Sequence, residues 1–148
     1  MANDFESVNY FCHDPWKALP APANVLASVK KYLAAGIPSI FGFWGFPSSQ
    51  NADVKGAFAF PAAGEHAIWG HAVVAVGYDD NLKITNLTSK KTTTGALLLR
   101  NSWGTSWGNN GYGWLPYDYV LSQFASDFWS LLSMRWVDLE AMQIKTRN

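Results

Sequence analysis

The sequence predicts an α+β domain in which one helix near the N-terminus is followed by four to six mostly antiparallel strands, forming an open β-barrel or half-barrel. Two observations support this fold class. One early segment carries apolar residues at helical spacing, and several later segments are short apolar runs separated by turn-forming residues. The 148 residues suffice for one domain with a buried core, so we expect a single domain over residues 1–148.

Prolines dominate the beginning of the chain, at Pro15, Pro20 and Pro22. They interrupt any continuous helix, so residues 1–23 are expected to form an extended N-terminal segment. Asn24 is expected to cap the helix that follows. Its helical spacing is carried by Val25, Leu26, Val29, Tyr32 and Leu33. Gly36 is expected to end it, as a glycine just after a helix commonly does.

The remainder of the chain predicts a succession of strands. Short apolar or β-branched runs place them at residues 37–44, 70–78, 94–100, 111–115 and 134–137. Residues 45–64 are expected to form a long loop with at most a short extended piece at 57–60. Residues 79–91 are polar and lack a clear period, so they predict an excursion between strands or a hairpin. A short helix or helical turn is predicted after residue 119 by Val120, Leu121, Phe124, Phe128 and Leu131.

Charge and composition exclude several kinds of partner. Eleven basic and eleven acidic residues cancel, so neither nucleic acid nor an anionic membrane is expected as a partner. No apolar run approaches the roughly 20 residues of a membrane helix, and the first residues do not resemble a signal peptide, so the segment is expected to be soluble. With 49% hydrophobic and only 15% charged residues, the chain has an excess of apolar surface that suggests an interface, a homodimer being one possibility.

The cysteine and histidine content argues against disulfides and metals. Cys12 is the only cysteine, which rules out an internal disulfide and leaves the redox compartment undecided. The three histidines, His13, His66 and His71, lack the paired spacing of a zinc motif, so no metal and no cofactor is expected.

Two stretches carry the chemistry of the chain. The first is GHAVVAVGY at residues 70–78, a predicted buried strand with His71 at its mouth, and the second is RNSWG at residues 100–104, directly after another predicted strand. Such a histidine is more often a core residue, and an asparagine at a strand end is more often a turn former. Side chains at the ends of neighbouring strands can nevertheless meet. An Asn101 carbonyl oxygen could then hold one ring nitrogen of His71 while the other faces a cysteine thiol.

The two motifs together resemble the C-terminal half of a papain-like cysteine peptidase, especially of the bacterial type. The specific part is RNSWGTSWGNNGYG at residues 100–113, following the histidine strand. The resemblance implies the barrel-bearing half of the papain-like fold, with His71 as general base and Asn101 as its orienting residue. It also implies that Trp103 shields this pair from water, while Trp107 is expected to pack in the core.

The chain departs from the family at the nucleophile. No glutamine-containing segment that ends in a cysteine and an aromatic residue is present, and Cys12 has a proline three residues after it. His71 follows Cys12 by 59 positions, whereas about 130 or more separate the two catalytic residues in this family. We therefore expect Cys12 to be a structural thiol. Gly70 and Asn109 are further departures, at positions where relatives commonly carry an acidic or amide residue and a glutamate.

Two functions remain open from the sequence. The first is a cysteine-type peptidase of which this chain carries the base and the orienting residue, acting on a peptide or protein substrate once a cysteine-bearing half, from the same precursor or a separate chain, is supplied. The second is a non-catalytic peptide- or protein-binding module that retains the fold and uses its aromatic face. The isolated chain is expected to be inactive under either hypothesis.

Overall fold

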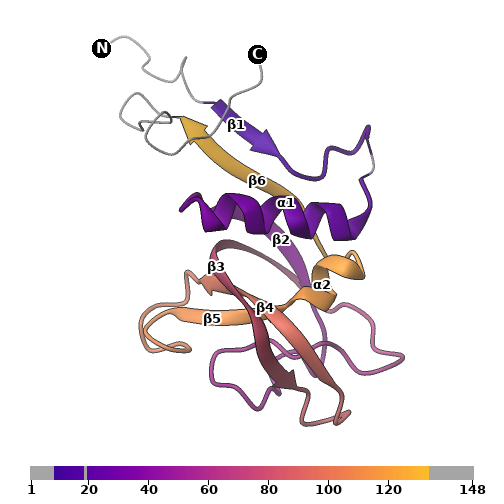
Figure 1. Ribbon diagram of the computed structural model, residues 1–148. Helices are drawn as coiled ribbons and strands as arrows, with labels where there is room; N and C mark the ends of the chain where they lie inside the picture. Colours follow the sequence, from indigo (N-terminus) through magenta and orange to yellow (C-terminus); the bar gives the residue numbers. More distant parts are fainter. Residues whose placement is uncertain (1–8, 19, 134–148) are drawn as a thin grey trace.

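One antiparallel sheet of six strands forms the centre of the protein (Figure 1). The computed structural model describes residues 9–18 and 20–133. Its elements, in chain order, are β1 (Asn9–Cys12), α1 (Pro22–Ala34), β2 (Ser39–Gly45), β3 (Trp69–Thr85), β4 (Thr92–Arg100), β5 (Tyr112–Pro116), α2 (Tyr117–Leu121) and β6 (Ala125–Ser133). The strand order is β1-β6-β2-β3-β4-β5, and every neighbouring pair is antiparallel.

The predicted antiparallel sheet with few helices is confirmed, with two corrections. The sheet is open, with β1 and β5 at its edges, so it does not close into a barrel. The predicted N-terminal helix is not the first element, because residues 9–12 of the expected extended segment form β1 and pair with β6. That pairing joins segments more than 110 residues apart, so the local sequence around the prolines does not reveal it.

Helix α1 begins three residues earlier than expected. Pro22 occupies its first turn, where the missing N–H costs nothing and the fixed φ suits the helix, and Ala21 is the N-cap. Asn24 therefore lies inside the first turn and does not cap the helix, which corrects the prediction. Gly36 follows the last turn with φ +79°, a left-handed conformation that glycine adopts without strain.

The hairpin of β3 and β4 is longer than predicted. Strand β3 continues through the polar residues to Thr85, so the expected excursion over residues 79–91 is mostly strand, with a turn at its tip. These residues are largely exposed, and an exposed hairpin arm needs no apolar alternation. In the loop of residues 45–64, the expected extended piece is reduced to one bridge between Ala57 and Trp114.

The C-terminal helix prediction was too long. Helix α2 ends at Leu121, and Phe128 and Leu131 belong to strand β6. Gln123 adopts φ +59°, which stops helical continuation. Phe124, Phe128 and Leu131 are spaced by four and three positions, which fits a helical period, although Phe128 and Leu131 lie in a strand. The predicted strand at residues 134–137 lies outside the described part of the chain.

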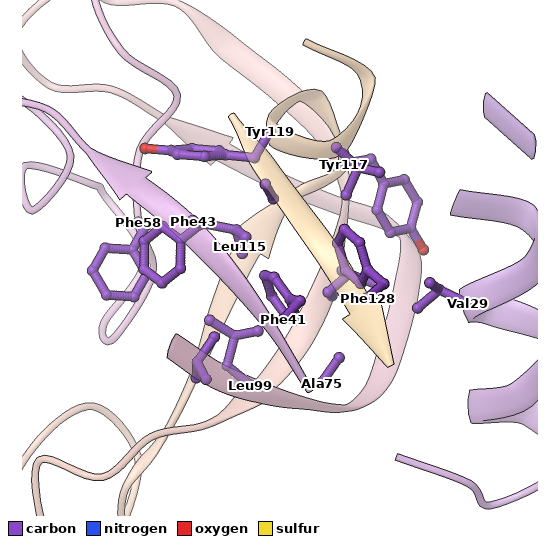
Figure 2. Packing of buried hydrophobic residues seen from close by; sticks show 14 of the residues in the cluster. Val29, Phe41, Phe43, Phe58, Ala75, Leu99, Leu115, Tyr117, Tyr119 and Phe128 are labelled. Atoms are coloured by element: carbon purple, nitrogen blue, oxygen red, sulfur yellow. The ribbon is translucent and has the colours of Figure 1, made fainter. Parts of the chain in front are cut away.

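The core fills the space between the sheet and α1 (Figure 2). Phe41 of β2 stacks on Phe128 of β6 with ring centroids 4.5 Å apart, and both are buried. Val29 reaches this cluster from α1, and the fully buried Tyr119 joins it from α2, with its hydroxyl donating to Ala59 O. This packing fixes the inner face of β2 and β3, on which the candidate site lies. Among the described residues, no helix is long and apolar enough to cross a membrane.

Candidate active site

His71 lies three residues into β3, opposite Phe43 of β2. Successive residues of a strand alternate between faces, so His71 shares the inner face with the buried Val73 and Ala75. The imidazole is half-buried at the rim of the core, and the Phe43 ring meets it edge-on with centroids 5.9 Å apart. A histidine at this place has one side against packed protein and the other toward the surface.

Asn101 is the hydrogen-bond partner of His71. It follows the last residue of β4, is 7% exposed, and places its Oδ1 2.8 Å from His71 Nε2. The same Oδ1 accepts the backbone N–H of Ser102 at 2.7 Å. A backbone N–H can bond only to the oxygen of the amide, so this contact fixes which way the Asn101 side chain is turned.

The orientation of Asn101 determines the tautomer of His71. Because an oxygen faces Nε2, that nitrogen must carry the proton, and Nδ1 of the neutral ring is then the acceptor. No described residue hydrogen-bonds to Nδ1, so its lone pair is available to take a proton. Asn101 Nδ2 is buried and has no hydrogen-bond partner among the described residues. The arrangement therefore fixes one ring nitrogen of His71 on an amide oxygen and leaves the other chemically able to accept a proton.

Trp103 covers the histidine. Its ring stacks on the imidazole with centroids 4.8 Å apart and 28° between the planes, and its side chain is 39% exposed. Trp107 meets Trp103 edge-on at 5.4 Å and lies half-buried against the core. The four residues singled out by the sequence are therefore brought together. An indole over the imidazole limits access of water to the bond beneath it, which strengthens that bond.

Three aromatic residues of this site were missed by the sequence analysis. Phe43, Phe58 and Trp69 form a wall around Trp103 and His71, with Phe58 5.9 Å and Trp69 6.4 Å from Trp103. Trp69 carries the signal that could have found it, since it lies two residues before His71 and thus on the same face of the strand.

Cys12 lies away from the pair. Strands β6 and β2 separate β1 from β3, which puts Cys12 about 14 Å from the His71 strand across the sheet. Partial burial raises the pKa of its thiol, and Sγ contacts Asp14 Oδ1 at 3.9 Å. Cys12 also lines a hollow of about 590 Å³ that includes neither His71 nor Asn101. Cys12 therefore does not belong to the site of His71 and Asn101, and it is only partly buried.

The other two histidines take no part in the site. His13 is buried between hydroxyl groups, and His66 is exposed. Within the residues that the structure describes, no cluster of three or more histidine, cysteine or acidic side chains is arranged to hold a metal ion.

The comparisons with known proteins agree on one family. The family model described as papain family cysteine protease matches residues 49–125, slightly more than half of the chain. An uncharacterised peptidase C1-like protein of Acanthamoeba polyphaga mimivirus is 40% identical over 104 residues, which are 68% of this chain and 30% of that protein. Residues 49–125, which the family model matches, contain His71, Asn101, Trp103 and Trp107.

Two solved structures resemble the fold. Xylellain, a cysteine protease from Xylella fastidiosa, is 30% identical with a TM-score of 0.60, covering 86% of this chain and 40% of xylellain. The clostridial cysteine protease Cwp84 is 22% identical with a TM-score of 0.57, covering 88% of this chain and 29% of Cwp84, and shows the fold alone. The chain thus spans well under half the length of each of these relatives.

Proposed function

The chain belongs to the papain family of cysteine proteases, and from that membership we propose that it supplies the general base and the orienting amide of a Cys/His/Asn peptidase site. His71 is the base, Asn101 orients it, and Trp103 with Trp107 shields the pair. The observation that carries the proposal is the hydrogen bond from His71 Nε2–H to Asn101 Oδ1, with the amide held by the Ser102 N–H. It leaves Nδ1 as the one nitrogen able to accept a proton.

The proposed reaction follows from this geometry. Nδ1 takes the proton of a cysteine thiol, and the resulting thiolate beside the imidazolium attacks the carbonyl carbon of the peptide bond. The imidazolium then returns that proton to the departing amine, leaving a thioester. Nδ1 next takes a proton from water, whose oxygen attacks the thioester carbon, and gives the proton to the thiolate that leaves. Through each step the Asn101 carbonyl keeps Nε2–H in place.

The nucleophile in this proposal comes from another segment. Cys12 is unsuitable because two strands lie between it and the His71 strand. The chain spans 40% of xylellain, which leaves room in a longer parent protein for a cysteine-bearing half. Under this proposal, residues 1–148 form the C-terminal half of a papain-like peptidase that acts on a peptide or protein substrate.

An apolar face of the sheet supports a docking partner. Residues that are cross-strand partners lie on the same face of a sheet. On the face opposite α1, a group of large apolar side chains from neighbouring strands is between 37% and 63% exposed. The set consists of Tyr10, Ile40, Trp44, Trp129 and Leu131. Such a patch on a small domain typically marks an interaction site. Because His71 lies on the inner face, the cysteine-bearing half must approach from that side, and we propose that this outer patch receives a second copy of the chain.

The test combines this chain with a cysteine-bearing half and follows cleavage of a fluorogenic peptide. The combination should be active, His71→Ala should abolish cleavage, and Asn101→Ala should lower kcat/KM at least about tenfold. His66→Ala and Cys12→Ser serve as matched controls and should leave the rate unchanged. Cleavage that survives His71→Ala, or that requires Cys12, would refute the proposed roles.

The second candidate is a non-catalytic binding module, favoured by the place of Cys12 and by the exposed aromatic face. Peptide binding without cleavage in the combined sample would support it. Light scattering at several concentrations separates a monomer from a homodimer of this chain.

A further inference from the structure

Two tryptophan–glycine pairs join β2 and β3 directly before His71. In the strand register, Trp44 lies opposite Gly70, Gly45 lies opposite Trp69, and the next rung toward the core pairs Phe43 with His71. A Cβ atom on Gly45 would come within 2.0 to 2.3 Å of three ring atoms of Trp69. A Cβ on Gly70 would be 3.2 Å from Trp44. Each indole therefore lies across the glycine of the opposite strand.

The two indoles lie on different faces of the sheet. Trp69 shares the inner face with His71, whereas Trp44 lies on the outer face and is 53% exposed. Only Trp69 contacts the rings of the site, with centroids 5.7 Å from Phe43 and 6.4 Å from Trp103. Phe43 and Trp103 are the two rings that contact the imidazole. Trp69 thus touches both supports of His71.

Trp103 needs such support because its backbone is at the surface. Residues 102–106 are all exposed, and Gly104 within them adopts φ +84°. The Trp103 ring is held over His71 by edge contacts with Phe58, Trp69 and Trp107. Glycine in a strand weakens it, and a cross-strand aromatic ring over the glycine restores packing. The Trp69 indole therefore restores packing at the end of the β2–β3 pair, where Gly45 weakens β2.

We infer that Trp69 is a positioning residue for His71, acting through Trp103 and Phe43. Its indole fits there only because Gly45, in the opposite strand, has no side chain. This inference rests on the proposed function, in which His71 is the base. The indole fills the volume above Gly45 and braces the Trp103 stack, which keeps water from the His71–Asn101 bond. Loss of the indole frees Trp103 to leave the imidazole and exposes that bond. Trp44, on the other face, does not have this role.

The inference is tested by nuclear magnetic resonance of the full chain carrying nitrogen-15 in its histidines. The wild type should show His71 as the Nε2–H tautomer, with slow exchange of that proton with water. Trp69→Leu and Gly45→Ala should each introduce the second tautomer and speed exchange about tenfold or more. The double variant Gly45→Ala/Trp69→Leu should be no worse than Trp69→Leu alone, because both changes remove the same contact. Trp69→Phe, which keeps an aromatic ring, should restore most of the protection.

Matched controls separate positioning from a general loss of stability. Trp114→Leu removes a half-buried tryptophan that packs against the buried Ala57, Ile84 and Ala96, away from His71. Gly70→Ala adds a methyl group next to the Trp44 indole on the outer face. Both should leave the His71 signals unchanged, even where they lower the melting temperature. The inference is overturned if the His71 proton exchanges at the wild-type rate in both Trp69→Leu and Trp69→Phe. It is also overturned if Trp114→Leu changes that rate as much as Trp69→Leu does, or if the effects of Gly45→Ala and Trp69→Leu add in the double variant. Asn101→Ala reports on the proposed function separately, since an unchanged tautomer there refutes the His71–Asn101 pair whatever Trp69 does.

Discussion

His13 provides a prediction about pH that can be worked from the structure. Its side chain is 4% exposed and lies between two hydroxyl groups, with Nδ1 2.8 Å from Ser28 Oγ of α1 and Nε2 2.8 Å from Ser130 Oγ of β6. The Tyr32 ring packs edge-on against it at 4.7 Å. A neutral imidazole donates from one nitrogen and accepts at the other, so this residue joins the end of β1, the helix and β6 in a single buried contact.

Burial lowers the pKa of His13 from 6.5 to about 4. The folded state therefore binds its proton less readily than the unfolded state does, and stability must fall as the pH falls. The contribution is complete above about pH 6.5, is lost progressively down to pH 4, and is absent below that value. A difference of 2.5 pH units corresponds to at most about 3 kcal/mol of unfolding free energy. Rotation of both hydroxyls to accept from the imidazolium would reduce this figure.

Urea unfolding between pH 8 and pH 3.5 measures the effect. Because carboxylates also titrate in this range, the quantity of interest is the difference between the wild type and His13→Gln, in which the amide keeps one donor and one acceptor. The wild type should lose up to about 3 kcal/mol relative to the variant as the pH falls from 7 to 4. His66→Gln, at an exposed site, should track the wild type. A difference that is independent of pH would refute the buried neutral histidine.

Two further substitutions test the packing that supports the site. Gly108→Ala should lower the unfolding free energy by more than about 2 kcal/mol, because Gly108 has φ +57° and a Cβ there would lie 2.2 Å from Tyr112 O, and thermal unfolding measures the loss. Phe128→Ala should cost about 3–5 kcal/mol in urea unfolding, since the ring is fully buried and stacked on Phe41. The exposed Leu121→Ala should stay within about 0.5 kcal/mol, and equal losses in the two would contradict the described core.

The sequence predicted those parts of the fold whose signals are local. The α1 spacing and the strand runs at residues 37–44, 70–78, 94–100 and 111–115 were visible within short windows, and the corresponding elements are present. Strand β1 was not predictable in the same way, because only its pairing with β6, far along the chain, makes it a strand. Phe128 and Leu131 illustrate the opposite error, since their spacing suits a helix while the backbone at Gln123 ends one.

The meeting of His71 and Asn101 was predictable because a hairpin returns the chain to its neighbour. The tautomer of His71 could not be predicted, because it depends on the direction of the Ser102 backbone N–H, which the residue type does not determine. The support from Trp69 was hidden for a similar reason. A tryptophan is bulky in any sequence, and its fit here depends on a glycine opposite it in another strand.

The contacts that order the His71–Asn101 pair are local to the described sheet. His71 lies on β3 and Asn101 follows β4, so both belong to one hairpin. The rings that contact His71, those of Phe43 and Trp103, come from residues within the same sheet and its following loop. Among the described residues, none hydrogen-bonds to Nδ1. Under the proposed function, docking of a cysteine-bearing half therefore adds a thiol to an already ordered base, and the pair should give the same His71 tautomer before and after that half binds.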